Sequence, residues 1–393
     1  MKSIKRILLV LSALALASVS FYFIDKISGE GKGPISATMD KIEKVLIGQP
    51  TKRPTVTEGT NEKRDSVKLK TIGRIPFNPG ISALKSPPKL MIGYAGSSIN
   101  ELVDATIDMD KKLDTRMDLV QIYSAWGSKP NEQFPKDQVS KIVQMGSVPI
   151  ITWEPWLSDF SDNIANQPPK EAREVNPLKT ISSGVYDNYI RTWAKEAKQI
   201  NAPLYLRFAH EMNDPYRYPW GPHNNEQGDF IAAWRHVHSI FKQMGADNVI
   251  WMWSIHSAYE NYQAFYPGDA FVDVVSTGIL NFGTSVYWSK WWTFEELFAP
   301  HYQALANFGK PIIIVEFGSL KVGGDRDKWY GDALTAIPKL YKKVKGIVFF
   351  NYPSDKTLTD KSVTWELGPN QTVTHRIKSI LKDWELNQYT FQK

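Results

Sequence analysis

The stretch "APLYLRFAHEMND", residues 202–214, contains the pattern that decides the fold of the whole chain. It begins as an apolar run typical of a buried strand and ends with an arginine, a histidine and a carboxylate close together. Polar groups at the end of such a strand are costly to bury without partners. This stretch therefore predicts a functional site at the end of a buried strand.

Seven further segments begin with or contain a similar apolar run. They are "KLMIGYAG" from residue 89, "DLVQIYSAW" from 118, "SVPIITWEPW" from 147, "NVIWMWS" from 248, "FVDVVSTGIL" from 271, "KPIIIVEFGS" from 310 and "VKGIVFFNYP" from 344. Helical patterns such as "FIAAWRHVHSIFKQMG" lie between several of them. Eight buried strands separated by helices over about 300 residues predict a (β/α)8 TIM barrel, an α/β fold.

A doubly wound open sheet is the competing interpretation of the same alternation. That fold commonly carries a glycine-rich phosphate loop after its first strand. The segment that follows "KLMIGYAG" has no such loop, which favours the barrel.

Composition excludes some classes of site. The 393 residues include no cysteine, so the chain can form neither disulfides nor thiolate metal sites. The net charge of +6 comes from residues 1–90, with 16 Lys and Arg against 7 Asp and Glu, which leaves 31 against 34 for the remainder. We therefore expect no nucleic-acid partner for the folded part.

The first residues resemble an export signal. Three positive charges precede an uncharged apolar run of 18 residues at 7–24, so residues 1–24 are predicted to be a signal peptide or an uncleaved membrane anchor. Residues 25–87 are polar and rich in Lys, Pro, Gly and Thr, which predicts a flexible linker or stalk. The barrel is expected at 88–385 and a tail at 386–393. This organisation predicts a monomeric protein that is secreted or held in the cell envelope, meeting a membrane only through its N-terminal segment.

The residues at the strand ends indicate a carbohydrate site. Catalytic side chains of such barrels lie at the carboxyl ends of the strands. Here those ends combine carboxylates and amides with many aromatic rings. Aromatic rings can cover the C–H faces of a sugar while polar planar groups bind its hydroxyls.

Two carboxylates are candidates for catalysis. Glu211 follows the fourth predicted strand and Glu316 ends the seventh. Retaining glycoside cleavage needs one carboxyl to protonate the leaving oxygen and another to attack the anomeric carbon, about 5 Å apart. Opposite sides of a barrel mouth can provide that spacing.

The motifs "RFAHEMN" with "YPWG", "TWEPW" and "PIIIVEFGS" resemble those of glycoside hydrolase family 26, the retaining β-mannanases and related β-glucanases. The resemblance covers roughly residues 88–385. It implies that Glu211 is the acid/base and Glu316 the nucleophile, with Arg207 and His210 in support. The expected substrate-binding residues are Trp153, Glu154, Asn213, Trp220, Trp253, Asn281, Trp288 and Asn351, with Trp220 as a sugar platform.

One position departs from the family pattern. The sixth strand of the family ends with a tyrosine that bonds the nucleophile, whereas this chain has "GILNFG" at 278–283 and places Leu280 there. A missing donor would stabilise the anionic nucleophile less. Tyr287 and Tyr94 are the candidates to supply the hydroxyl.

Metal chemistry is not expected. His236 and His238 form "HVH", but side chains at i and i+2 of a helix point apart, and no HExxH spacing occurs.

Together with the family resemblance, the sequence predicts a cofactor-free retaining endo-β-glycanase acting on β-mannan or mixed-linkage β-glucan. The alternative is a weakly active or inactive barrel that binds carbohydrate or assists exopolysaccharide assembly.

Overall fold

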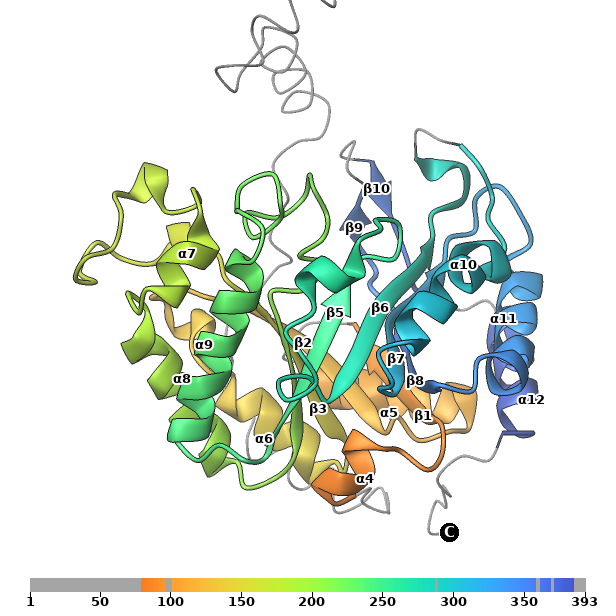
Figure 1. The fold of residues 1–393 in the computed structure, drawn as a ribbon. Coiled ribbons are helices and arrows are strands. Elements are labelled where there is room, and N and C mark those ends of the chain that lie inside the picture. The colour runs from red at the N-terminus through yellow and green to blue at the C-terminus, as the bar shows by residue number, and fades with distance from the viewer. Residues whose placement is uncertain (1–78, 97–100, 287–288, 358–360, 369–370, 385–393) are drawn as a thin grey trace, which may run out of the picture. The chain divides into compact units, whose positions relative to one another are not determined.

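The computed structural model describes residues 79–96, 101–286, 289–357, 361–368 and 371–384. Eight parallel strands close into a barrel in sequential order, with β8 paired to β1, as Figure 1 shows. The strands are β1 (Met91–Ala95), β2 (Leu119–Ala125), β3 (Val148–Glu154), β4 (Leu204–Phe208), β5 (Val249–Ile255), β6 (Val274–Asn281), β7 (Ile312–Ser319) and β8 (Val344–Phe350). The predicted TIM barrel is confirmed.

Helices cover the outside of the barrel. They are α5 (Leu102–Leu113), α6 (Lys136–Gln144), α7 (Pro177–Ser182), α8 (Asp187–Gln199), α9 (Asp229–Gln243), α10 (Phe294–Ala306), α11 (Arg326–Leu340) and α12 (Gln371–Leu381). A two-stranded antiparallel sheet, β9 (Asp355–Lys356) with β10 (Ser362–Val363), follows β8. Short 3-10 turns are η3 (Pro130–Glu132), η4 (Leu157–Asp159), η5 (Lys170–Ala172), η6 (Tyr262–Phe265) and η7 (Gly283–Ser285).

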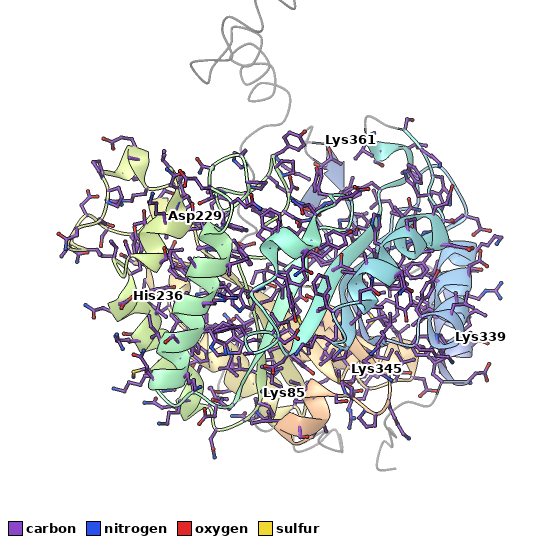
Figure 2. The ribbon with its side chains drawn as sticks, in the orientation of Figure 1. Lys85, Asp229, His236, Lys339, Lys345 and Lys361 are labelled. Carbon is purple, nitrogen blue, oxygen red and sulfur yellow. The ribbon has the colours of Figure 1, made fainter. Side chains whose placement is uncertain are left out.

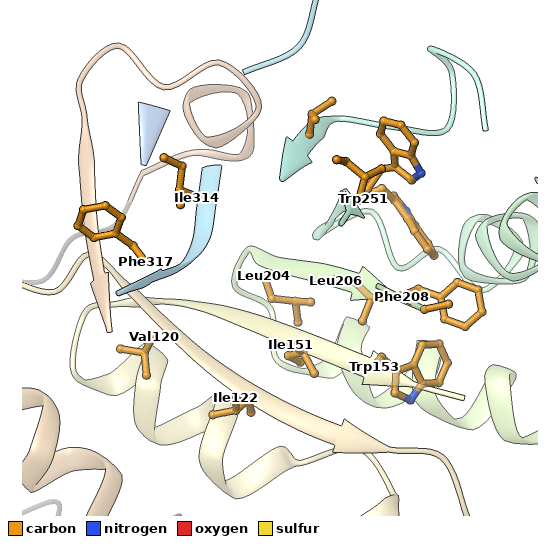
Figure 3. Packing of buried hydrophobic residues seen from close by; sticks show 14 of the residues in the cluster. Val120, Ile122, Ile151, Trp153, Leu204, Leu206, Phe208, Trp251, Ile314 and Phe317 are labelled. Atoms are coloured by element: carbon orange, nitrogen blue, oxygen red, sulfur yellow. The ribbon is translucent and has the colours of Figure 1, made fainter. Parts of the chain in front are cut away.

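Two apolar clusters cover the two faces of the barrel sheet, one against the helices and one along the barrel axis. Alternate strand residues face the helices, as the close-up of Ile151, Trp153, Leu206 and Phe208 shows (Figure 3). The residues between them face the barrel axis, where the lower layers are apolar and include Tyr205. Because neighbouring strand residues point to opposite sides, each strand end sends one side chain to the mouth and the next to the helix layer.

The helix α4 (Ile81–Lys85) packs at the end of the barrel opposite the mouth. Leu84 is fully buried in the axial cluster, and the Tyr205 hydroxyl donates to its carbonyl oxygen over 2.8 Å. Lys85 forms an ion pair with Asp273 at 3.0 Å, and Figure 2 shows Lys85 at this end, far from Lys361. The described part of the predicted linker, residues 79–87, thus includes a helix packed on the barrel.

No helix within these described ranges is both long and apolar enough to cross a membrane. The predicted signal or anchor at 1–24, the rest of the linker and the tail at 386–393 lie outside the described residues. Their predicted roles therefore stay predictions.

Candidate active site

Glu316 lies where the pairing of β7 becomes irregular. On one side, Thr277 pairs with Ile314 and Gly278 with Glu316, so Val315 is an extra residue in β7. Val315 packs in the axial cluster, whereas Ile314 faces the helices. A bulge of this kind re-aims side chains, and here it lets the consecutive Val315 and Glu316 both point inward.

Two donors from opposite strands bind the same oxygen of Glu316. Arg207 Nη1 on β4 donates to Glu316 Oε1 at 2.9 Å, and the Tyr123 hydroxyl on β2 donates to that oxygen at 2.5 Å. The Gln121 amide in turn donates to the Tyr123 oxygen at 2.9 Å. Hydrogen bonds to the charged form favour an ionised carboxylate.

Arg207 is completely buried and held in place by neighbouring strands. Its Nε donates to Ser254 Oγ at 2.7 Å, and its Nη1 also reaches Thr152 Oγ1 at 3.3 Å. Burial alone would lower the pKa of this guanidinium, but the charges of Glu316, Tyr123 and Glu211 outweigh burial and raise it. Arg207 thus remains a fixed positive charge between the two glutamates.

Glu211 lies on a turn that follows β4. Its amide donates to the Ser254 carbonyl at 2.8 Å, which ties the turn to β5. Ala209 and Glu211 adopt left-handed backbone angles, with φ of 43° and 54°. Such angles are uncommon for residues other than glycine and concentrate at functional sites. The turn aims a buried carboxylate back over the mouth, as the sequence predicted.

Gly278 lies between the two carboxylates. A Cβ atom on this glycine would lie 3.7 Å from Glu316 Oε2 and 3.8 Å from Glu211 Oε1. These two oxygens are therefore separated by no more than the sum of the distances, about 7.5 Å. The two predicted glutamates thus lie on either side of Gly278, and Oε2 is the Glu316 oxygen near this glycine.

Glu211 has a second acidic neighbour. Ligand atoms of Glu211, Asp214 and His256 all lie within 4.8 Å of one another, and Arg217 Nη1 lies 3.6 Å from Glu211 Oε2. Burial raises the pKa of the Asp214 carboxyl, His256 lowers it, and Glu211 raises it. Within the described part of the chain this trio is the set of side chains that could hold a metal ion, but Arg217 beside it disfavours a cation.

His210 contacts residues on both sides of the Glu211 turn. Its Nε2 lies 3.1 Å from the Tyr218 hydroxyl and 3.9 Å from Glu154 Oε1. Trp156 Nε1 donates to the other oxygen of Glu154 at 3.1 Å. Glu154 and His210 therefore lie together beside the Glu211 turn, and the prediction that Glu154 binds substrate stays a prediction.

Four predicted sugar contacts are corrected, because burial places these side chains in the protein interior. Trp153 faces the helices and stacks on Trp193 with ring centroids 4.3 Å apart. Trp253 also faces outward, against Tyr266 and Phe308. The remaining two are Trp220 and Asn281.

Trp220 is not an open sugar platform. One face stacks on Tyr218 at 4.6 Å and 9°, and its Nε1 donates to the His210 carbonyl at 2.7 Å. Asn281 donates to Ser319 Oγ and accepts from the Gly283 amide, which fixes the loop after β6. Trp220 and Asn281 therefore stabilise the segments that carry the site rather than present a surface to a sugar.

The remaining predicted contacts have mixed outcomes. Asn213 is a further correction, because its amide oxygen accepts from the His256 amide and its nitrogen donates to the carbonyls of His256 and Tyr259. Asn351 lies just after β8, half-buried, and accepts from the Leu367 amide at 2.7 Å. Trp288 lies outside the described residues, so its prediction stays open.

The missing family tyrosine is replaced from another strand. Tyr94 faces the helix layer, and Tyr287 lies outside the described residues. The hydroxyl on Glu316 comes instead from Tyr123. Leu280 pairs with Gly318, two residues beyond Glu316, and fills the space that the glycine leaves.

The other histidines behave as the helix geometry predicts. His236 on α9 bonds Asp187 of α8 at 2.6 Å, in the outer helix layer seen in Figure 2. His238 instead packs against Trp251 and Phe271. The "HVH" pair thus points in two directions.

Comparisons with known proteins find glycoside hydrolases among the similar sequences and folds. Residues 159–313 match the family model of glycosyl hydrolase family 26. Over these residues the barrel resembles this family. Endoglucanase H of Acetivibrio thermocellus is 33% identical to this chain over 245 residues, 60% of this chain and 25% of that protein. The mannan endo-1,4-beta-mannosidase of Bacillus subtilis is 25% identical over 198 residues, 48% of each chain.

Solved family 26 structures share the fold. GH26C from a Muricauda species has a TM-score of 0.56 at 18% identity, covering 76% of this chain and 87% of that one. The catalytic domain of a Bacillus endo-beta-1,4-mannanase has a TM-score of 0.55 at 14% identity, with the same coverage. The chain spans a quarter of the full length of Endoglucanase H and about half that of the Bacillus mannosidase.

Proposed function

We propose that this barrel is a retaining endo-β-glycanase, with Glu211 as acid/base and Glu316 as nucleophile. The observation that carries the proposal is the pair of buried carboxylates on either side of Gly278, at most about 7.5 Å apart between the oxygens near this glycine. This limit includes the separation of about 5 to 5.5 Å in retaining enzymes and also the lower part of the inverting range, about 6.5 to 9.5 Å. The retaining outcome therefore rests on the motif resemblance and is decided by the anomeric form of the product.

The chemistry proceeds in two displacements. Glu316 Oε2 attacks the anomeric carbon while Glu211 gives its proton to the departing glycosidic oxygen. Glu211, now ionised, takes a proton from water, whose oxygen attacks the same carbon and releases Glu316. Each step inverts the anomeric centre, so the product retains the β configuration.

The surroundings of the two glutamates favour these different roles. Arg207 and Tyr123 donate to Glu316, which supports the ionised nucleophile. Glu211 instead lies among groups of both signs, with Asp214 and His256 beside it and Arg217 Nη1 3.6 Å from its Oε2. The two carboxyl groups therefore have different surroundings, as the two roles of such a pair require.

The proposed substrate class is a β-linked glucan or mannan, with mixed-linkage β-glucan first. Endoglucanase H is 33% identical over 60% of this chain, while the mannosidase is 25% identical over 48%. A polymeric substrate of this kind also fits the predicted export of the chain, since such glycans lie outside the cytoplasm.

The test uses the full chain on mixed-linkage β-glucan, β-mannan, glucomannan and β-1,3-xylan. We expect oligosaccharides from one of the first three, with β-anomeric reducing ends in early time points by proton NMR. Glu211→Ala and Glu316→Ala should each lose this activity. Glu196→Ala, which removes a surface carboxylate paired with Lys136 on the outer helices, is the matched control.

Two results would overturn the proposal. The first is α-anomeric product, which would show inversion. The second is binding to one of these glycans without any product from the folded wild-type chain, which would favour the non-hydrolytic carbohydrate-binding role.

A further inference from the structure

The hydroxyl that orients the nucleophile has moved to a different strand in this chain. The motif resemblance places a tyrosine at the end of the sixth strand, and Leu280 occupies that position. The structure brings a hydroxyl to Glu316 from Tyr123, 193 residues earlier in the chain. We propose that Tyr123 is the positioning residue of the nucleophile, with Gln121 holding its hydroxyl. This inference rests on the proposed function for the role of Glu316.

The strand geometry explains why Tyr123 can reach the carboxylate. Gln121 and Tyr123 are two residues apart on β2, so both point to the barrel axis, while Ile122 between them packs in the helix-facing cluster. The Gln121 amide donates to the Tyr123 oxygen, which leaves the single phenolic proton for Glu316. The hydrogen bonds therefore run in one direction, from the Gln121 amide to the Tyr123 oxygen and from the Tyr123 hydroxyl to Glu316.

Packing restricts the ring of Tyr123 as well. It makes edge-to-face contacts with His210 at 6.4 Å and with Tyr352 at 6.3 Å between ring centroids. The ring thus lies between the acid/base turn and the segment after β8. A hydroxyl on a ring restrained from both sides holds a more defined position than one on a mobile loop.

The two donors also distinguish the two oxygens of Glu316. Tyr123 and Arg207 both bond Oε1, and Oε2 is the oxygen on the Gly278 side. A carboxylate bonded in this way cannot rotate about its terminal torsion without losing both bonds. Tyr123 therefore orients Oε2 toward the substrate and leaves Arg207 to supply the charge.

The experiment compares wild type, Tyr123→Phe and a matched control, Tyr205→Phe. Tyr205 also points into the barrel but lies at the end opposite the mouth. Tyr205→Phe likewise removes one buried hydrogen bond, the one to the Leu84 carbonyl. We expect Tyr123→Phe to reduce kcat/KM by roughly 10- to 100-fold and to move its acidic limb up by about one pH unit, since an anion-stabilising donor is lost. Tyr205→Phe should keep the wild-type pH profile. An unchanged profile in Tyr123→Phe would overturn the inference.

A second readout does not depend on turnover. The carboxyl carbons of 13C-labelled glutamates are titrated by NMR, and the signal missing in Glu316→Gln assigns Glu316. Tyr123→Phe should move the Glu316 titration to higher pH, and Tyr205→Phe should leave it in place. If the wild type cleaves no glycan yet this shift is seen, the positioning role stands and the hydrolase proposal fails. If glycan is cleaved and the titration does not shift, the positioning role fails alone.

Discussion

The two sides of the barrel mouth hold their glutamates in contrasting ways. On the β7 side, Glu316 is part of a strand and receives two donors, Arg207 and Tyr123. On the β4 side, Glu211 lies on a strained turn and is surrounded by Asp214, His256 and Arg217. The first arrangement holds one oxygen of a carboxylate with two donors, and the second places groups of both signs around a carboxylate. Under the proposed mechanism, the neighbours of the two glutamates rather than the glutamates themselves separate the nucleophile from the acid/base.

The largest expected loss of activity comes from removing one of the two glutamates, and rescue by azide distinguishes Glu316 from Glu211. On an aryl β-glycoside with a good leaving group, Glu316→Ala should lose activity on the order of 10⁵-fold, because the attacking carboxylate is gone. Azide should restore turnover and give the α-glycosyl azide, since it attacks the face that Glu316 would use.

Glu211→Ala should give the opposite stereochemistry with azide. Loss on the polysaccharide should be on the order of 10³-fold because proton donation to a poor leaving group is lost. Azide should intercept the covalent intermediate and give the β-glycosyl azide, identified by NMR of the product. The same azide anomer from both variants would contradict the assignment of the two sides.

An intermediate loss of activity is expected from Gly278→Ala, which tests the space between Glu211 and Glu316. The new Cβ would lie 3.4 Å from Glu316 Cβ, an ordinary contact, but also between the two carboxylates. We expect a loss of kcat/KM of roughly 100-fold, because about 1 Å of misplacement at reacting groups has that cost. Thermal unfolding should change little. Gly346→Ala, where the Cβ would meet Ile313 Cγ2 at 3.4 Å lower in the barrel, is the matched control.

The smallest effect concerns how Asp214 makes the stability of the fold depend on pH. Its folded pKa is raised above the ordinary 3.8, first by burial and in part by Glu211. The folded state thus binds this proton more tightly than the unfolded state, so stability falls as pH rises from 3.8 through the folded pKa. Asp214→Asn removes that loss and keeps an oxygen for the Tyr216 amide.

We therefore expect Asp214→Asn to unfold about 2 °C higher than wild type at pH 7 and to match it near pH 3.5, measured by calorimetry. Asp229→Asn, on the outer helix α9, is the matched control for exchanging a carboxyl for an amide. A stability gain at pH 3.5 equal to that at pH 7 would contradict the linkage.

The sequence predicted the barrel, and it placed Glu211, Glu316, Arg207 and His210 at the carboxyl ends of β4 and β7, where the structure has them, because strand ends and motif spacing depend on the local chain. It failed for Trp153 because Glu154 next to it faces the mouth, so alternation sends Trp153 outward. Trp253 fails similarly, since the neighbouring Ser254 is the one that bonds Arg207 on the axis. Alternation could have found both corrections.

The partner of Glu316 could not be found in that way. Alternation indicates that Tyr123 points inward, but several strands do the same with polar residues. Which of them meets Glu316 depends on the bulge at Val315 and on how β2 and β7 approach across the closed barrel. Those are properties of three-dimensional closure rather than of any local stretch.

The attachment of α4 at the end opposite the mouth has a consequence for how a mechanical load would reach the site. Residues 79–87 join the barrel through Leu84 and Lys85, beneath the amino ends of the strands. A pull on α4 would be borne first by the apolar lower layers and by the ion pair between Lys85 and Asp273. These contacts include neither Glu211 nor Glu316, so such a load would reach the two glutamates only through the strands.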